Sequence, residues 1–283
     1  MKNMEFLSNQ VSTKFISAGG ITYAYRTLGE NTGVPLVCFQ HFTGNMDEWD
    51  PLILDGLARN RQVIWFNSRG VASTTGTVPE SVVEMANDAV TFITALGLQR
   101  VDLLGYSLGG FMAQEIAVLH AGLVRKVMLV ATGPRGGEGI GEFPQYLSSA
   151  LQYDGAERFL YMFFEKSGTS RAKGFETLAR LQSRIRDKDI PVSMQVVEAQ
   201  TKAIANWGNA NAPDDTYLKA ITQPILVVNG SNDRMFPTIN SYRLFQGLPN
   251  AQLSLYPDSA HGSLFQYPEL FVQQAAYFLD NDI

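Results

Sequence analysis

The segment Gly105-Tyr-Ser-Leu-Gly109 places a hydroxyl group between two glycines, directly after the apolar run Val101–Leu104. A G-x-S-x-G pattern that ends a strand and opens a helix is typical of a nucleophile elbow. Such a turn leaves no room for bulky neighbours, which explains the glycines, and the helix beginning at Leu108 directs its free N–H groups at the site. We therefore predict that Ser107 is a nucleophile.

A serine hydroxyl needs a base before it can attack, and the sequence contains only three histidines: His41, His120 and His261. His41 precedes the elbow. His120 lies near the far end of the helix that the elbow opens, roughly 20 Å from the serine. In the chain order serine, acid, histidine that accompanies this kind of turn, only His261 remains. We predict that His261 is the base.

The base in turn needs a carboxylate that holds its tautomer and stabilises the imidazolium. Asp233 follows the expected strand Pro224–Asn229, which places it at the carboxyl edge of the sheet. Asp258, three residues before His261, is the rival, although its position favours a role in a surface loop or turn. The loop after the expected strand Arg125–Ala131, where some triads place their acid, opens with Thr132-Gly-Pro, and this opening offers no acid. We predict that Asp233 is the orienting acid.

A developing oxyanion needs two N–H donors. The N–H group of Leu108, directly after the nucleophile, is one candidate. The loop Gln40-His-Phe-Thr-Gly44 follows another expected strand, and the N–H group of Phe42 is the second candidate. We expect His41 to brace this loop rather than to transfer protons.

Short apolar runs alternate with longer helix-like segments along most of the chain. Continuous apolar strands separated by helices predict an α/β fold whose parallel sheet is covered on both faces, and right-handed crossovers make it doubly wound. The first expected strand alternates and is predicted to be antiparallel. The expected strands are Ile21–Thr27, Pro35–Gln40, Gln62–Asn67, Val101–Gly105, Arg125–Ala131, Pro224–Asn229 and Ala251–Tyr256; the expected helices are Trp49–Asn60, Val82–Leu96, Leu108–His120, Ile239–Leu248 and Tyr267–Asp280.

One stretch, residues 133–215, breaks this alternation. It opens with a glycine-rich loop and continues with helix-like segments rich in aromatic residues. We predict a helical cap inserted into a core formed by residues 1–132 and 216–283. The aromatic side chains that pack this cap onto the core are expected to give the site an apolar wall. They are Phe143, Tyr146, Tyr153, Phe159, Tyr161, Phe163 and Phe164.

Composition excludes several classes of function. The 22 Lys and Arg residues against 27 Asp and Glu residues give a net charge of −5 without a basic block, which argues against nucleic acid as a partner. Cys38 is the only cysteine, so no internal disulfide or Cys/His zinc site is expected. Residues 1–20 lack the apolar core of a signal peptide, and no apolar run approaches the roughly 18 residues of a membrane span. We expect a soluble cytoplasmic protein without metal or organic cofactor.

These motifs together resemble the α/β-hydrolase superfamily over nearly the whole chain. The resemblance implies a mostly parallel sheet of about eight strands with a cap over the site. Within the superfamily the chain is similar to small esterase, lactonase and cofactor-free haloperoxidase-like members. Two positions depart from the family pattern: Phe42 stands where a glycine usually follows the histidine, and Asn67 stands where an aspartate is usual. Besides the elbow, the matching segments are Gln40–Gly44, Asn67–Gly70, Gly230–Asp233 and His261–Gly262.

The sequence therefore predicts a serine hydrolase that cleaves a small ester or lactone with an apolar portion through an acyl-enzyme. Two alternatives stay open. A C–C bond hydrolase or lyase uses the same three residues, and a hydrolase-fold sensor binds a small ligand and turns it over slowly.

Overall fold

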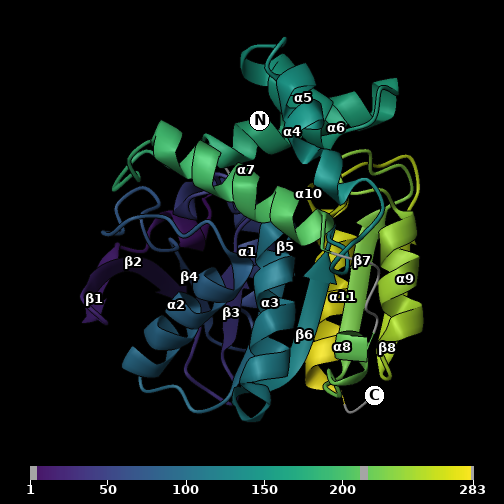
Figure 1. Ribbon diagram of the computed structural model, residues 1–283. Helices are drawn as coiled ribbons and strands as arrows, with labels where there is room; N and C mark the ends of the chain where they lie inside the picture. Colours follow the sequence, from purple (N-terminus) through teal and green to yellow (C-terminus); the bar gives the residue numbers. More distant parts are fainter. Residues whose placement is uncertain (1–4, 211–215, 282–283) are drawn as a thin grey trace.

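The computed structural model describes residues 5–210 and 216–281 of the chain, and it contains one eight-stranded sheet. The strand order is β1-β2-β4-β3-β5-β6-β7-β8, and all neighbours from β4 to β8 are parallel, whereas β1 and β2 run antiparallel (Figure 1). The antiparallel direction of the strand near Ile21 is confirmed. The strands are β1 Lys14–Ala18, β2 Ile21–Leu28, β3 Leu36–Phe39, β4 Val63–Phe66, β5 Val101–Tyr106, β6 Val124–Val130, β7 Ile225–Gly230 and β8 Ala251–Tyr256.

Helices cover both faces of this sheet, as the continuous apolar strands predict. Every residue of β3, β4, β5 and β7 is buried. One face packs against α2, α3 and α9, and the other against α1 and α11 (Figure 1). These helices are α1 Pro51–Leu57, α2 Val82–Ala95, α3 Leu108–Leu119, α9 Ile239–Gly247 and α11 Pro268–Asp280, with the short α8 Thr216–Lys219 before β7 and α10 Ser263–Gln266 before α11.

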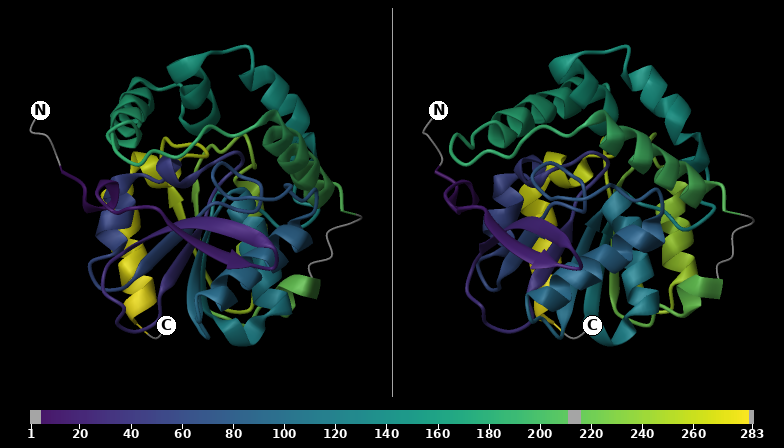
Figure 2. Two further views of the ribbon diagram at one scale, coloured as in Figure 1. Left: turned by 90° about the vertical axis from the view of Figure 1, so that its left-hand side faces the viewer. Right: turned by 60° about the vertical axis from the view of Figure 1, so that its left-hand side comes forward.

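Four helices between β6 and β7 form the inserted cap, which lies over the carboxyl ends of the parallel strands (Figure 2). They are α4 Phe143–Ala150, α5 Gly155–Phe163, α6 Gly168–Leu181 and α7 Met194–Gly208. The predicted boundary between cap and core at residue 215 falls outside the described residues. Because active sites of open α/β sheets lie at this edge, the cap encloses the place where the predicted site residues should meet.

Besides the short helices α8 and α10, which were not expected, two elements differ from the expectation. Strand β1 was not expected, because most of its side chains face solvent and its sequence lacks a buried apolar face. The first helix spans Pro51–Leu57 rather than Trp49–Asn60. It begins at Pro51 because the Asp50 side chain accepts a hydrogen bond from the N–H of Leu52, which is the arrangement of a helix N-cap.

A buried ion pair attaches the α6 side of the cap to the core. Arg180 on α6 donates three hydrogen bonds of 2.7–3.0 Å to the carboxylate of Asp50, which has no accessible surface. Burial raises the pKa of Asp50 and the guanidinium group of Arg180 opposes that rise. Since breaking a buried pair leaves an uncompensated charge, this contact holds α6 firmly over α1.

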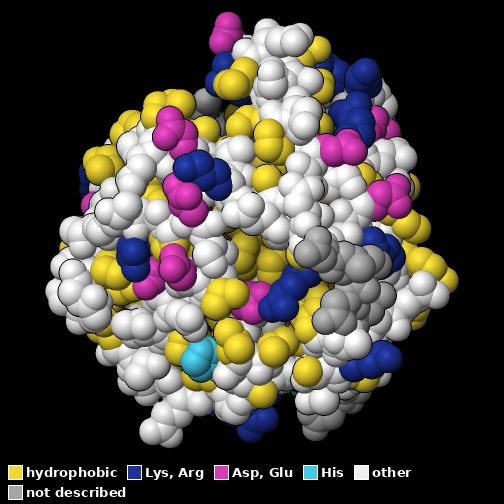
Figure 3. All heavy atoms as spheres, in the orientation of Figure 1, with side chains coloured by type: hydrophobic (Ala, Val, Ile, Leu, Met, Phe, Trp, Pro, Cys, Tyr) yellow, Lys and Arg dark blue, Asp and Glu magenta, His cyan; other side chains and the backbone are white. Residues whose placement is uncertain are grey.

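One face of the molecule mixes both signs of charge. The face in Figure 3 shows acidic and basic side chains scattered among hydrophobic ones, without a large area of one sign. Among the described residues, no helix has the combination of length and apolar character that crossing a membrane requires.

Candidate active site

The turn between β5 and α3 carries Ser107 in a strained backbone conformation. Its φ of 56° and ψ of −118° lie in a region that a non-glycine residue rarely adopts. The turn is held because the N–H of Ser107 donates to the carbonyl of Val130, 2.8 Å away. A Cβ atom on Gly109 would lie 2.3 Å from the carbonyl oxygen of Phe39, so only glycine lets α3 approach β3 this closely.

The structure brings the three predicted catalytic side chains into one line. The Oγ atom of Ser107 lies 2.9 Å from Nε2 of His261, and Nδ1 of His261 lies 2.8 Å from Oδ2 of Asp233. Because a carboxylate accepts hydrogen bonds, Nδ1 carries the proton, and Nε2 presents its lone pair to the serine hydroxyl. This is the geometry in which a histidine can take a proton from a serine.

The carboxylate of Asp233 is fixed by the backbone as well as by the histidine. Its Oδ1 atom accepts hydrogen bonds from the N–H groups of Met235 and Phe236, at 2.9 and 3.1 Å. Its own N–H donates to Oγ1 of Thr238, which closes the turn after β7. Asp233 is therefore held in one orientation, with its second oxygen directed at His261.

The loop after β3 lies beside the elbow, because β3 pairs with β5 up to Phe39 and Gly105. Neither the N–H of Phe42 nor that of Leu108 donates a hydrogen bond within the described part of the chain. Both donors are therefore unused, and an oxyanion hole requires two such donors.

The carbonyl oxygen of Phe42, in contrast, accepts two hydrogen bonds. It accepts hydrogen bonds from Nδ1 of His41 at 2.8 Å and from Oγ1 of Thr43 at 2.7 Å. The N–H of Thr43 donates to Oε1 of Gln200 on α7, which ties the loop to the cap. His41 therefore braces the loop, as the sequence predicts.

Sequence reasoning missed one side chain of this region, Glu48. Its Oε2 atom lies 3.3 Å from Nε2 of His41. Burial, and then the charge of Asp47, raise the pKa of Glu48 to about 8, while burial lowers the pKa of His41 to about 4. The Glu48 side chain is 44% accessible. The sequence signal that could have identified Glu48 is the presence of a carboxylate in the same loop as His41.

The other candidate residues lie away from this line. His120 ends α3 and lies 3.4 Å from the side chain of Asn87. Asp258 accepts a hydrogen bond of 2.7 Å from Oγ of Ser167, the N-cap of α6, so it contacts the cap rather than His261. Among the described residues, no His, Cys, Asp and Glu side chains gather in a group that could hold a metal ion.

Aromatic rings enclose the three catalytic candidates. The ring of Phe163 at the end of α5 lies 6.0 Å from that of His261, and the ring of Phe236 lies 5.2 Å from it. Phe143 on α4 packs against Phe42 at 4.9 Å. Ser107 and His261 have no accessible surface, so the cap excludes bulk water from the hydroxyl group in this conformation.

The fold and this elbow define a family. Residues 34–268 match the family model described as alpha/beta hydrolase fold, and the chain belongs to this family. As the resemblance implies, the chain has the family's eight strands and its helical insertion.

Three similar proteins illustrate the range of the family. The solved structure of an alpha/beta hydrolase fold protein from Chitinophaga pinensis is 48% identical, covers 97% of this chain and 99% of its own, and superposes with a TM-score of 0.95. A non-heme chloroperoxidase of Streptomyces lividans is 26% identical over 90% of this chain and 94% of its own. The solved structure of Est816, an N-acyl homoserine lactone degrading enzyme, is 24% identical, covers 94% of this chain and 100% of its own, and has a TM-score of 0.74; it shows the shared fold.

Proposed function

We propose that this α/β hydrolase cleaves a small ester or lactone through an acyl-enzyme on Ser107. The observation that carries the proposal is the continuous line of hydrogen bonds from Asp233 through His261 to Ser107. The two free N–H groups beside the nucleophile support it, because acyl transfer develops negative charge on an oxygen at that position.

The first half of the reaction forms the acyl-enzyme. Oγ of Ser107 attacks the carbonyl carbon while Nε2 of His261 takes the hydroxyl proton. The carbonyl oxygen becomes an oxyanion, which the N–H groups of Phe42 and Leu108 stabilise. Asp233 stays ionised and stabilises the imidazolium through Nδ1. When the tetrahedral intermediate collapses, His261 gives the proton to the leaving alkoxide, and the alcohol departs or, in a lactone, remains tethered.

The second half hydrolyses the acyl-enzyme. His261 takes a proton from water, and the hydroxide attacks the acyl carbon. The same two N–H groups hold the new oxyanion, and the proton returns to Oγ of Ser107 as the acid is released. All of these steps are carried by side-chain and backbone groups of this chain.

The surroundings favour a substrate with an apolar portion. The rings of Phe163 and Phe236 contact that of His261, and Phe143 packs against Phe236. An apolar group gains free energy when it leaves water for such surroundings. Because Ser107 is fully covered, a substrate reaches it only when cap side chains move, so bulky polymeric substrates are disfavoured.

A substrate panel tests the proposal. Short-chain nitrophenyl esters, simple lactones and a vinylogous diketone with a scissile C–C bond are assayed with the wild type and with Ser107→Ala. Repeated turnover of esters or lactones that is lost in Ser107→Ala supports the proposal. Turnover of the diketone alone would replace it with C–C hydrolysis, and a single acylation event without turnover would replace it with a sensor.

A further inference from the structure

A second histidine–carboxylate pair lies close to the catalytic line. Its members are His41 and Glu48, whose Nε2 and Oε2 atoms are 3.3 Å apart. The rings of His41 and His261 both contact the ring of Tyr106, at centroid distances of 5.2 and 5.6 Å. Nothing in the reaction above uses this pair.

The hydrogen bonds of His41 fix where its proton lies. The carbonyl oxygen of Phe42 can only accept, so Nδ1 of His41 must donate to it over 2.8 Å. In a neutral imidazole, Nε2 then carries a lone pair. A lone pair attracts Oε2 of Glu48 only if that carboxyl group is protonated and donates a hydrogen bond.

We propose that Glu48 is a positioning residue of the oxyanion loop: it donates a hydrogen bond to His41, which in turn holds the carbonyl group of Phe42. The inference rests on the proposed function, because Phe42 supplies one N–H of the oxyanion hole there. With its carbonyl group held by His41 and Thr43, Phe42 has little freedom to turn its N–H away from the oxyanion.

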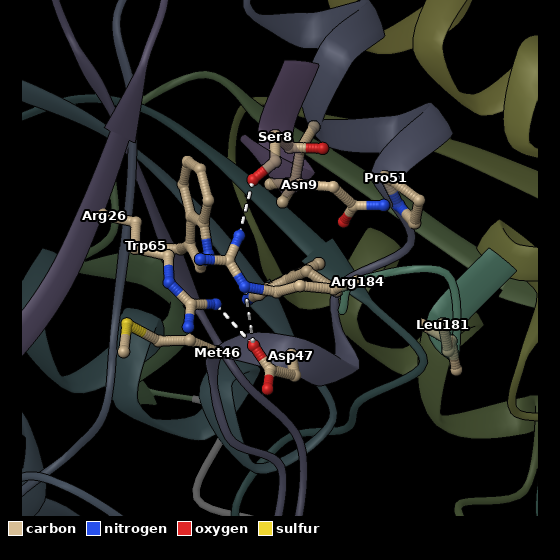
Figure 4. Close-up of a pocket in the computed structure, with 11 residues that line it drawn as sticks. Ser8, Asn9, Arg26, Met46, Asp47, Pro51, Trp65, Leu181 and Arg184 are labelled. Atoms are coloured by element: carbon tan, nitrogen blue, oxygen red, sulfur yellow. Dashed lines mark hydrogen bonds and ion pairs between the residues drawn. The ribbon is translucent and has the colours of Figure 1, made fainter. Parts of the chain in front are cut away.

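The turn that carries Glu48, Met46–Glu48, is anchored through Asp47. Figure 4 shows the guanidinium groups of Arg26 and Arg184 converging on the carboxylate of Asp47. Both arginines are buried, with side chains 1% and 4% accessible. Arg26 comes from β2 and Arg184 from the segment after α6, so this cluster joins the sheet, the turn and the cap. Glu48 is therefore presented to His41 from a rigid support.

The charges around the pair favour a carboxyl group that keeps its proton. Asp47, in the same turn, carries a negative charge that raises the pKa of Glu48. The two arginine partners of Asp47 come from β2 and from the segment after α6. Tyr106 on β5 stays neutral, because burial raises its pKa well above the usual value. His261, after β8, disfavours a second positive charge on His41.

These properties set the direction of a pH dependence. The pKa of Glu48 is raised to about 8, so the hydrogen bond to His41 is present below that pH and is lost as the pH rises through it. Above about pH 8 an ionised carboxylate faces the lone pair of Nε2, and the loop loses its brace. We expect kcat to fall on this alkaline side, in addition to the acid-side loss when His261 is protonated.

Nitrogen-15 NMR of the histidine rings tests the proton positions without any substrate. The expected result at pH 7 is a neutral His41 with its proton on Nδ1, and a change in its Nε2 signal as the pH passes about 8. A His41 that is protonated on Nε2 or positively charged at pH 7 would overturn the proposal. This measurement does not depend on the proposed function.

Three variants test the consequence for catalysis. Glu48→Gln keeps a donor for Nε2 but cannot ionise, so it should lower kcat at pH 7 by no more than about threefold and abolish the alkaline fall. Glu48→Leu removes the donor and should lower kcat about ten- to hundredfold with little change in KM, less than the loss of a complete oxyanion donor. Glu198→Gln removes an exposed carboxylate from α7 and is the matched control.

The outcomes separate the two proposals. An alkaline fall that persists in Glu48→Gln, or a Glu48→Leu enzyme as active as Glu198→Gln, would overturn the role of Glu48 while ester hydrolysis by the wild type stands. If the wild type hydrolyses no ester or lactone, the proposed function fails, and the NMR result alone decides whether Glu48 and His41 share a proton. A Glu48→Leu variant that does not fold leaves Glu48→Gln and the NMR titration as the deciding measurements.

Discussion

His261 and His41 are both buried, both contact Tyr106 and Phe163, and both have a carboxyl group at one ring nitrogen. They differ in what the other ring nitrogen faces. Nε2 of His261 faces the hydroxyl of Ser107, from which it can take a proton, whereas Nδ1 of His41 faces a carbonyl oxygen, to which it can only donate. A histidine–carboxylate pair is therefore no catalytic signature by itself, because its third partner decides whether the proton can move.

The carboxyl groups differ in the same sense. Asp233 accepts two backbone N–H hydrogen bonds besides that of His261, so its carboxylate is held by three donors. For Glu48 burial raises the pKa to about 8, which favours the protonated form. The carboxylate of Asp233 stabilises a positive charge as it develops, whereas the protonated carboxyl group of Glu48 holds a neutral ring in place.

The largest effect is expected from removing the nucleophile. Ser107→Ala should lower kcat for ester hydrolysis by on the order of 10⁶, because no other hydroxyl among the described residues is aligned with Nε2 of His261. Kinetics with a nitrophenyl ester measure the loss, and circular dichroism controls for folding. A folded variant with activity within tenfold of the wild type would contradict the role of His261 as the ring that takes a proton from Ser107.

Asp233→Asn should have the next largest effect. An asparagine donates as well as accepts, so it permits the tautomer of His261 whose proton points at Ser107, and kcat should fall by on the order of 10⁴. The measurement is kcat at pH 7 on the same ester. The account requires His261 to depend on the carboxylate of Asp233, and a loss of kcat below tenfold would contradict this.

A negative charge added at Asn67, which contacts the turn that carries Glu48, should affect stability more than catalysis. The side-chain nitrogen of Asn67 donates to Asp189, and its oxygen accepts from the N–H of Met46 in the turn that carries Glu48. Asn67→Asp places two carboxylates against each other and should lower the free energy of unfolding by about 1–3 kcal/mol. Urea unfolding measures the change.

The reciprocal variant Asn67→Asp/Asp189→Asn restores a donor opposite an acceptor and is the control. It should recover most of the lost stability. Equal stability of the single variant and the wild type would show that this contact does not support the turn.

The smallest effect is expected at Asp258. Asp258→Asn can still accept a hydrogen bond from Ser167, and asparagine tolerates the φ of 45° at this position. We expect kcat to change less than about tenfold, in line with a partly exposed carboxylate at the base of the cap. If Asp258→Asn lost most of its kcat while Asp233→Asn kept its own, Asp258 would have to act as the acid.

The parts of the fold that sequence predicts are those whose signals are local. Strands β3, β4, β5 and β7 are buried at every residue, and their apolar runs are unmistakable. Ser107 is identified by glycines that a tight turn requires, and Asp233 and His261 follow strands whose ends meet at one edge. Strand β1 was missed because an edge strand with exposed side chains has no such pattern.

The parts that the sequence did not predict depend on contacts between distant segments. Nothing in the chain around Glu48 indicates that it reaches His41, because the contact depends on how the loop folds back. Similarly, Arg26, Asp47 and Arg184 come from three separate regions and meet only in the folded protein. Asn67, a departure from the family pattern, gains its physical reason only from its neighbour Asp189.

The central claim, that His261 activates Ser107 and His41 does not, is tested most directly by covalent labelling. The wild type, Ser107→Ala and His261→Ala are treated with a fluorophosphonate, and the labelled peptide is identified by mass spectrometry. The account predicts one adduct on Ser107 in the wild type, none in Ser107→Ala, and labelling slowed by several orders of magnitude in His261→Ala. An adduct on another residue, or undiminished labelling of Ser107 without His261, would contradict it.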